Sequence, residues 1–70
     1  MKFLLVIQIC SAVLQQCTEP LKIYPMYDSH YDCATGGFIR GLTALREIGQ
    51  EEVDKSRIIV NFSCQKQDSV

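Results

Sequence analysis

The first seventeen residues, MKFLLVIQICSAVLQQC (1–17), decide which fold the rest of the chain must build. They contain one basic residue, Lys2, then an apolar run of 12 residues from Phe3 to Leu14, and then a short polar end. Such a run rises about 1.5 Å per residue as a helix and cannot cross a hydrocarbon core of about 30 Å. This order of features is typical of a secretory signal peptide, so residues 1–17 predict a secreted, extracellular protein.

The cysteines favour cleavage after Cys17. That cut removes Cys10 together with Cys17 and leaves Cys33 and Cys64, an even number that allows one disulfide. Cleavage at earlier positions leaves three cysteines and therefore an unpaired thiol. The expected mature chain has about 53 residues and is linked by one Cys33–Cys64 disulfide.

A second interpretation keeps the N-terminal segment. Phe3 to Ile9 can equally form a fully buried strand, because a short apolar run has the same pattern in both cases. The chain would then be a small cytosolic α/β subunit or fragment with four free thiols, stable as an oligomer. Two strands make only a thin sheet, and a third strand from residues 3–9 would make the architecture more stable.

The chain that follows residue 17 is small and weakly acidic. It lies near the lower size limit for unaided folding, so a covalent link is expected. A bridge between Cys33 and Cys64 closes a loop of about 32 residues, for which the chain-entropy model gives roughly 3 to 4 kcal/mol. Without Lys2, six basic residues stand against eight acidic ones, a net charge of −2. This balance argues against nucleic acid as a partner and against insertion into anionic membranes, since both need a concentrated positive face.

The sequence after residue 17 begins with a predicted strand and a predicted helix. Residues 21–27 (LKIYPMY) alternate apolar and polar side chains and form a short strand, which Pro25 confines to a sheet edge. Residues 28–32 form a polar loop. Apolar residues at helical spacing predict a helix from about residue 36 to Ile48, with Thr35 as its cap.

The last segments are a linker, a strand and a tail. Residues 50–56 are acidic and polar and form a loop or a single helical turn. Residues 57–64 alternate regularly and give the clearest strand pattern, whereas residues 65–70 are expected to be a disordered tail. The prediction is a single α+β domain over residues 18–64, in the order strand, helix, strand. If the two strands are neighbours, a right-handed crossover makes them parallel.

Asn61-Phe62-Ser63 satisfies the N-glycosylation sequon. The alternation of residues 57–64 places Asn61 on the face opposite Val60 and Phe62, where an oligosaccharide would have access. We therefore expect glycosylation of Asn61 if the chain passes through a eukaryotic secretory pathway.

A segment rich in tyrosine and aspartate is the expected partner-binding surface. Tyrosine supplies a large contact area at low entropic cost, although the same side chains could instead pack over the helix. The predicted contact residues are Tyr27, Asp28, His30, Tyr31 and Asp32. Asp28, His30 and Asp32 are spaced by two, so an extended backbone would place three zinc-type ligands on one side. No cofactor is expected for the favoured function, and metal binding through His30 is an alternative.

The sequence favours binding over catalysis. A disulfide-bonded cysteine cannot act as a nucleophile, and one histidine with scattered serines does not form a catalytic triad. The favoured function is that of a small secreted protein that binds an extracellular protein as a ligand, effector or inhibitor, either alone or as a homodimer. The alternatives are an oligomeric cytosolic subunit and a luminal metal-binding protein.

Overall fold

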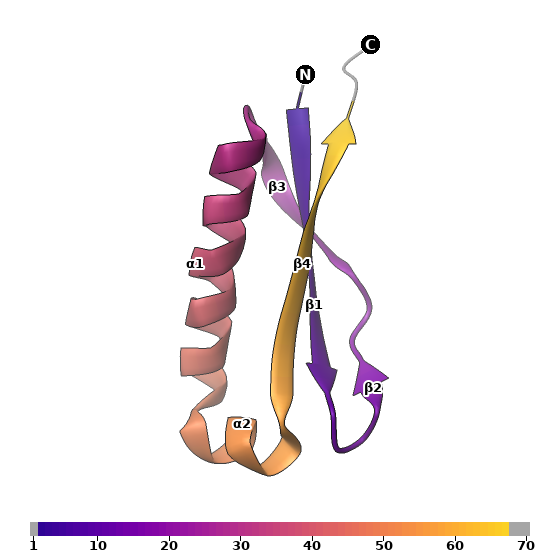
Figure 1. The fold of residues 1–70 in the computed structure, drawn as a ribbon, viewed down its shortest axis with the longest axis vertical. Helices are drawn as coiled ribbons and strands as arrows, with labels where there is room; N and C mark the ends of the chain where they lie inside the picture. Colours follow the sequence, from indigo (N-terminus) through magenta and orange to yellow (C-terminus); the bar gives the residue numbers. More distant parts are fainter. Residues whose placement is uncertain (1, 68–70) are drawn as a thin grey trace.

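The computed structural model describes residues 2–67 of the chain. Its elements follow in the order β1 (Lys2–Ser11), β2 (Gln16–Cys17), β3 (Leu21–Tyr27), α1 (His30–Ile48), α2 (Gln50–Ser56) and β4 (Ile58–Gln67) (Figure 1). The four strands form one sheet, so the predicted α+β class is confirmed.

Strand β1 is the centre of the sheet. It pairs antiparallel with β4 along its whole length, and on its other edge it pairs antiparallel first with β3 and then with β2 (Figure 1). The register places Leu5 opposite Ile23 on one side and opposite Cys64 on the other. The strands β3 and β4 therefore run parallel to each other, as expected for a crossover, but β1 lies between them.

The N-terminal segment has the position that the second interpretation gives it. An apolar run is suited to a central strand because pairing on both edges satisfies its backbone groups and leaves its side chains to be buried. Removal of residues 1–17 would take away the strand with which both β3 and β4 pair. Cleavage after Cys17 stays a prediction, and the structure described here is that of the chain with this segment in place.

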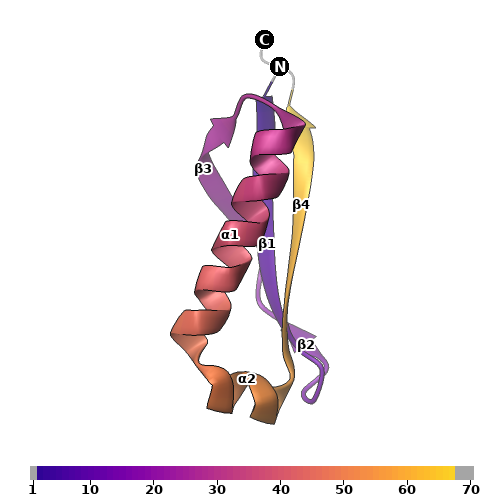
Figure 2. The same cartoon turned by 60° about the vertical axis from the view of Figure 1, so that its left-hand side comes forward.

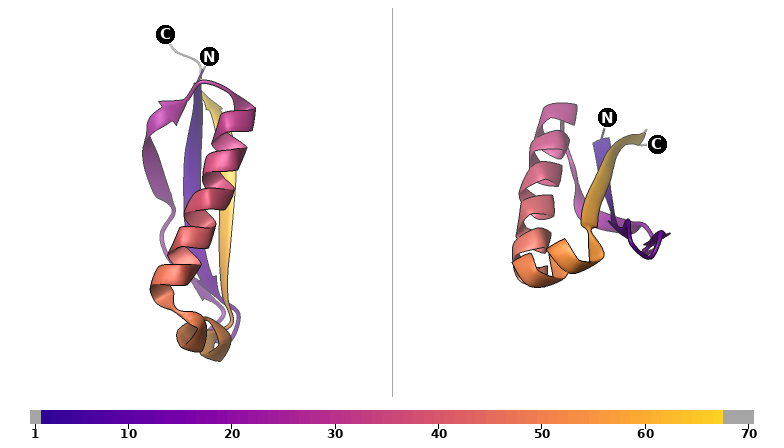
Figure 3. Two further views of the ribbon diagram at one scale, coloured as in Figure 1. Left: turned by 90° about the vertical axis from the view of Figure 1, so that its left-hand side faces the viewer. Right: turned by 60° about the horizontal axis from the view of Figure 1, so that its bottom comes forward.

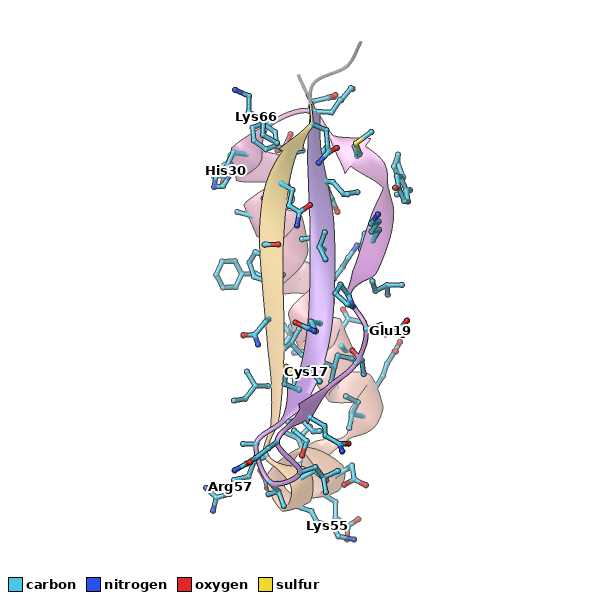
Figure 4. The ribbon with its side chains drawn as sticks, turned by 90° about the vertical axis from the view of Figure 1, so that its right-hand side faces the viewer. Cys17, Glu19, His30, Lys55, Arg57 and Lys66 are labelled. Atoms are coloured by element: carbon cyan, nitrogen blue, oxygen red, sulfur yellow. A yellow bond between two sulfur atoms is a disulfide. The ribbon has the colours of Figure 1, made fainter. Side chains whose placement is uncertain are left out.

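Helix α1 covers one face of the sheet and crosses the strands at an angle (Figures 2 and 3). The opposite face is not covered by a helix (Figure 4). Alternate residues of β1 point toward α1, and Leu5 and Ile7 form the buried core together with Cys33 of the helix. Partly buried side chains from the sheet surround this core: Phe3, Ile23, Tyr27, Val60, Phe62 and Cys64.

The domain contains two disulfides, so the expectation of a single one is wrong. Cys33–Cys64 joins α1 to β4 and is the pair that the sequence predicts. Cys10–Cys17 joins β1 to β2, at positions that are direct partners in the strand register. Cleavage after Cys17 would remove both members of this second pair, whereas with the segment in place the register of β1 and β2 brings them together. Since all four cysteines are bridged, the four free thiols of the second interpretation are absent as well.

Helix α1 begins at His30, about six residues earlier than predicted. The Ser29 hydroxyl accepts a hydrogen bond from the backbone N–H of Asp32 at 3.0 Å and caps the helix. Thr35, the predicted cap, lies inside the helix, and its hydroxyl donates to the carbonyl of Tyr31 at 2.9 Å. Residues 30–32, predicted as part of a polar loop, are therefore the first turn of α1.

Two further segments are more regular than the sequence predicts. Residues 50–56, predicted as a loop or a single helical turn, form the seven-residue helix α2, which ends at Arg57 in a left-handed conformation with φ of 51°. Strand β4 continues to Gln67 because Gln65–Gln67 pair with Lys2–Leu4 of β1. The predicted disordered tail is thus wrong for residues 65–67, and residues 68–70 lie outside the described part of the chain.

Glycines let α1 approach the sheet closely. Gly37 and Gly41 are buried on the helix face toward β4. A Cβ atom at Gly37 would lie 2.4 Å from the Phe62 ring, which is closer than real contacts allow, whereas one at Gly41 would lie 3.5 Å from Val60. The close packing of α1 on β4 therefore requires glycine at position 37 and tolerates alanine at position 41.

We expect opposite effects from alanine at these two positions. Gly37→Ala should lower the free energy of unfolding by about 1 to 3 kcal/mol, because the Phe62 ring must move away from the helix. Gly41→Ala should raise it by up to about 1 kcal/mol through the higher helix propensity of alanine. Urea denaturation with intact disulfides measures both values. A Gly37→Ala protein as stable as the Gly41→Ala protein would contradict the close approach of α1 to β4.

Candidate binding groove

A groove of about 900 Å³ lies between α1 and β3. Its apolar residues come from β1, β3 and α1, and they are Ile7, Ile9, Leu21, Ile23, Met26, Ile39 and Ala44. Leu21 on the strand and Ile39 on the helix are 60% and 61% exposed. The groove therefore presents apolar side chains that the fold itself leaves uncovered.

The borders of the groove carry more acidic than basic groups. Asp28 and Asp32 lie at the end formed by the start of α1, and Glu47 lies near the end of the same helix. Arg40, between them on α1, is the basic residue of the lining. The groove thus combines an apolar interior with a border that carries three carboxylates and one guanidinium group.

The structure brings part of the predicted contact surface to this groove. Tyr27, Asp28 and Asp32 line it. His30 does not, because its ring packs edge-on against the Phe3 ring with 5.7 Å between centroids. Tyr31 is 77% exposed on the first turn of α1 and is likewise not part of the lining. The Tyr27 ring closes the groove at one end, where its hydroxyl lies against Gly36.

Sequence reasoning missed the interior of the groove. Ile7 and Ile9 belong to the segment that the favoured interpretation removes, and no prediction is made for Ile39 from the sequence, although all three residues line the groove. The signal that could have identified Ile39 is its spacing from Arg40, Thr43 and Glu47, which share the groove side of α1. The strand residues could be found only by keeping the N-terminal segment in the fold.

Asp28 is held by Lys2 from the start of β1. The two side chains form an exposed ion pair, and the hydrogen bond from the Lys2 ammonium group together with its positive charge lowers the pKa of the Asp28 carboxyl. The pair links the beginning of the central strand to the turn between β3 and α1. Because both groups are exposed, the interaction positions the turn more than it stabilises the domain.

The residues considered for zinc binding do not converge. Asp28 pairs with Lys2, His30 packs against Phe3, and Asp32 lines the groove. Within residues 2–67, no group of three or more histidine, cysteine, aspartate or glutamate side chains is arranged to hold a metal ion. The spacing of Asp28, His30 and Asp32 places them on one side only if the backbone is extended. Because α1 begins at His30, a turn and a helix replace that extended backbone.

Asn61 lies on the sheet face that no helix covers. It is opposite Gln8 in the register, and its side chain is exposed. Its amide nitrogen is 3.6 Å from the Cys10 sulfur, to which it donates a weak hydrogen bond. The side chain is therefore accessible, and glycosylation at this position stays a prediction.

A second, smaller groove of about 450 Å³ lies on the other side of α1, next to β4. Its lining is entirely uncharged: Gly37, Phe38, Gly41, Leu42, Leu45, Ile58, Ile59, Val60 and Phe62. The rings of Phe38 and Phe62 meet edge to face with 5.0 Å between centroids. Even so, Phe38 is 72% exposed and Leu42 is 51% exposed, so this groove is also open.

Comparison of the chain with protein-family models, with curated proteins and with solved structures finds no match. Across residues 2–67, no helix combines the length and the apolar character needed to span a bilayer. The two grooves, the disulfides and the charges around them are therefore the features that bear on function.

We expect Lys2→Gln to raise the pKa of Asp28 toward its ordinary value, because the main cause of the shift is removed. The contribution of the pair to stability is present above the ordinary aspartate pKa and is lost as the pH falls through the lowered pKa. Carboxyl chemical shifts followed by NMR titration measure the change. Lys22→Gln on β3 removes the same charge elsewhere and is the control. Equal Asp28 titration in the wild type and Lys2→Gln would contradict the ion pair.

Proposed function

We propose that this protein acts in an extracellular or luminal compartment by binding another protein, and that the groove between α1 and β3 receives an apolar segment of that partner. The observation that carries the proposal is the uncovered apolar lining of this groove, in which Leu21 and Ile39 stay more than half exposed. Contiguous exposed apolar surface with a polar border is characteristic of protein-binding sites.

The location is supported by the disulfides. Two disulfides in a domain of this size are compatible with an extracellular location, since such bonds persist in oxidising compartments and are rare in the cytosol. They also favour the binding hypothesis over the cytosolic subunit, whose thiols would stay reduced. The small core, with Leu5 and Cys33 as its completely buried side chains, gives the covalent links a large share in stability.

The charges at the border indicate what kind of segment would bind. Asp28, Asp32 and Glu47 outnumber Arg40, so a partner segment with lysine or arginine beside its apolar residues is favoured. Apolar side chains of the segment would fill the space between Ile23 and the helix. The basic residues would add specificity and a faster association rate more than affinity.

An intact-mass measurement tests the location and the N-terminus together. The chain is produced in eukaryotic cells that secrete proteins, and its mass is measured with and without alkylation and after removal of N-linked sugar. We expect an oxidised chain that retains β1, lacks four hydrogens and does not react with iodoacetamide. A sugar-dependent mass difference would support modification at Asn61.

Two other results have clear meanings. A cytosolic chain with four alkylatable cysteines would contradict the proposed location. A product that starts at Thr18 and lacks two hydrogens would support cleavage after Cys17, and it would contradict the groove because Ile7 and Ile9 would be lost from its lining.

Selection of peptides tests the groove. Displayed peptides are selected on the immobilised oxidised full-length protein, and binders are then measured against Ile39→Glu and Leu42→Glu. Both substitutions place a charge on an exposed apolar position of α1, but Ile39 lines the groove toward β3 whereas Leu42 lines the one toward β4. We expect peptides with apolar and basic residues whose affinity falls at least about tenfold with Ile39→Glu and is unchanged by Leu42→Glu. Equal losses, or none, would contradict the groove proposal.

A further inference from the structure

The outer edge of β4 differs from the outer edge of β3. Strand β3 contains Pro25, which has no backbone N–H to donate, and carries Lys22, two features that disfavour further strand pairing. Strand β4 has ten residues and contains neither proline nor charge from Ile58 to Gln65. We propose that β4 pairs with β4 of a second copy of this chain, forming a homodimer with one continuous antiparallel sheet.

The hydrogen-bond pattern shows which backbone groups of β4 are free. The N–H and C=O of Ile9 bond to Thr18, so they point away from β4. Its register partner Val60 therefore directs its own N–H and C=O away from β1, toward the outer edge. By alternation, the same holds for the other even-numbered residues of the strand, namely Ile58, Phe62, Cys64 and Lys66. The Arg57 carbonyl, which accepts from Ala12, agrees with this parity.

A second copy is the occupant that suits this edge. An antiparallel pair of identical strands is related by a two-fold axis, so every donor on one copy meets an acceptor on the other without any additional chemistry. The antiparallel register that pairs the largest number of outward-pointing backbone groups of the two β4 strands places Phe62 opposite Phe62 of the second copy. In this register, the β4 side chains that face α1 in one copy lie next to the β4 side chains that face α1 in the other copy. Both helices therefore lie on the same side of the joined sheet.

The groove between α1 and β4 is then covered from outside. Phe38 and Leu42 stand above the edge strand on the helix, and in the dimer they face α1 of the second copy. No charged residue lines this groove, so its burial leaves no unpaired ion. The net charge of the chain, −1, adds little repulsion between the copies.

The area of this contact is at the lower limit for a stable dimer. A ten-residue strand is about 33 Å long, and the strand and helix layers together are about 15 Å deep. A strip of this size buries about 500 Å² on each copy, and specific interfaces start at roughly 1,000 Å² in total. The dimer is therefore expected to form reversibly with concentration.

Sedimentation equilibrium of the oxidised full chain tests the dimer at protein concentrations from about 10 μM to about 1 mM. Dissociation constants in this range are expected for a small interface. We expect a reversible dimer that Leu42→Glu weakens at least about tenfold and that Ile39→Glu leaves unchanged. A monomer over the whole range would overturn the proposal. So would a dimer that Leu42→Glu leaves intact or that Ile39→Glu also disrupts.

Hydrogen exchange of the wild-type protein identifies the edge without any substitution. The amides of Ile59, Asn61 and Ser63 point toward β1 and should be protected at every concentration. The amides of Val60 and Phe62 should exchange freely when dilute and become protected as the dimer forms. A dimer in which these two amides stay unprotected would use another surface and would overturn the proposal.

Discussion

The pairing of β1 on both of its edges is the constraint on which the other elements depend. Since β3 and β4 each pair with β1, they are held in one sheet only through it. The same strand supplies Leu5 and Ile7, the two residues against which Cys33 of α1 is buried. A domain with so few buried side chains has little stability to spare, so the order of the sheet and the position of the helix are set by one ten-residue segment.

The two sides of α1 differ in how much space remains between the helix and the sheet. Gly37 and Gly41 let the helix approach β4, where Phe62 fits against the backbone of α1. Toward β3, Gly36 makes a similar close contact with the Tyr27 ring, and beyond it Ile39 and Arg40 line a groove of about 900 Å³, compared with about 450 Å³ next to β4. Each side of the helix therefore combines a close contact at a glycine with an open groove, and the groove toward β3 is the larger of the two.

Much of the fold could be predicted from local sequence patterns, and the failures share physical causes. The alternation of residues 57–64 located β4, and the even count of cysteines identified the Cys33–Cys64 pair. The helix start was missed because residues 28–32 have a polar, loop-like composition and Thr35 is a suitable N-cap residue, whereas the Ser29 hydroxyl caps the helix six residues earlier. Periodicity could not decide between a leader and a buried strand for residues 3–9, since both are short and apolar. The interior of the groove was missed with that segment, although Tyr27, Asp28 and Asp32 at its border were named.

The two disulfides also change what a break in the backbone would do. Each closes a covalent ring, one over residues 10–17 and the other over residues 33–64, and the second ring contains all of α2 and most of α1 and β4. A protease that cuts once within α2 opens that ring but releases no fragment, because α1 and β4 stay joined through sulfur. The sheet, the core and both grooves would then remain in one covalent molecule until a reductant separates the pieces.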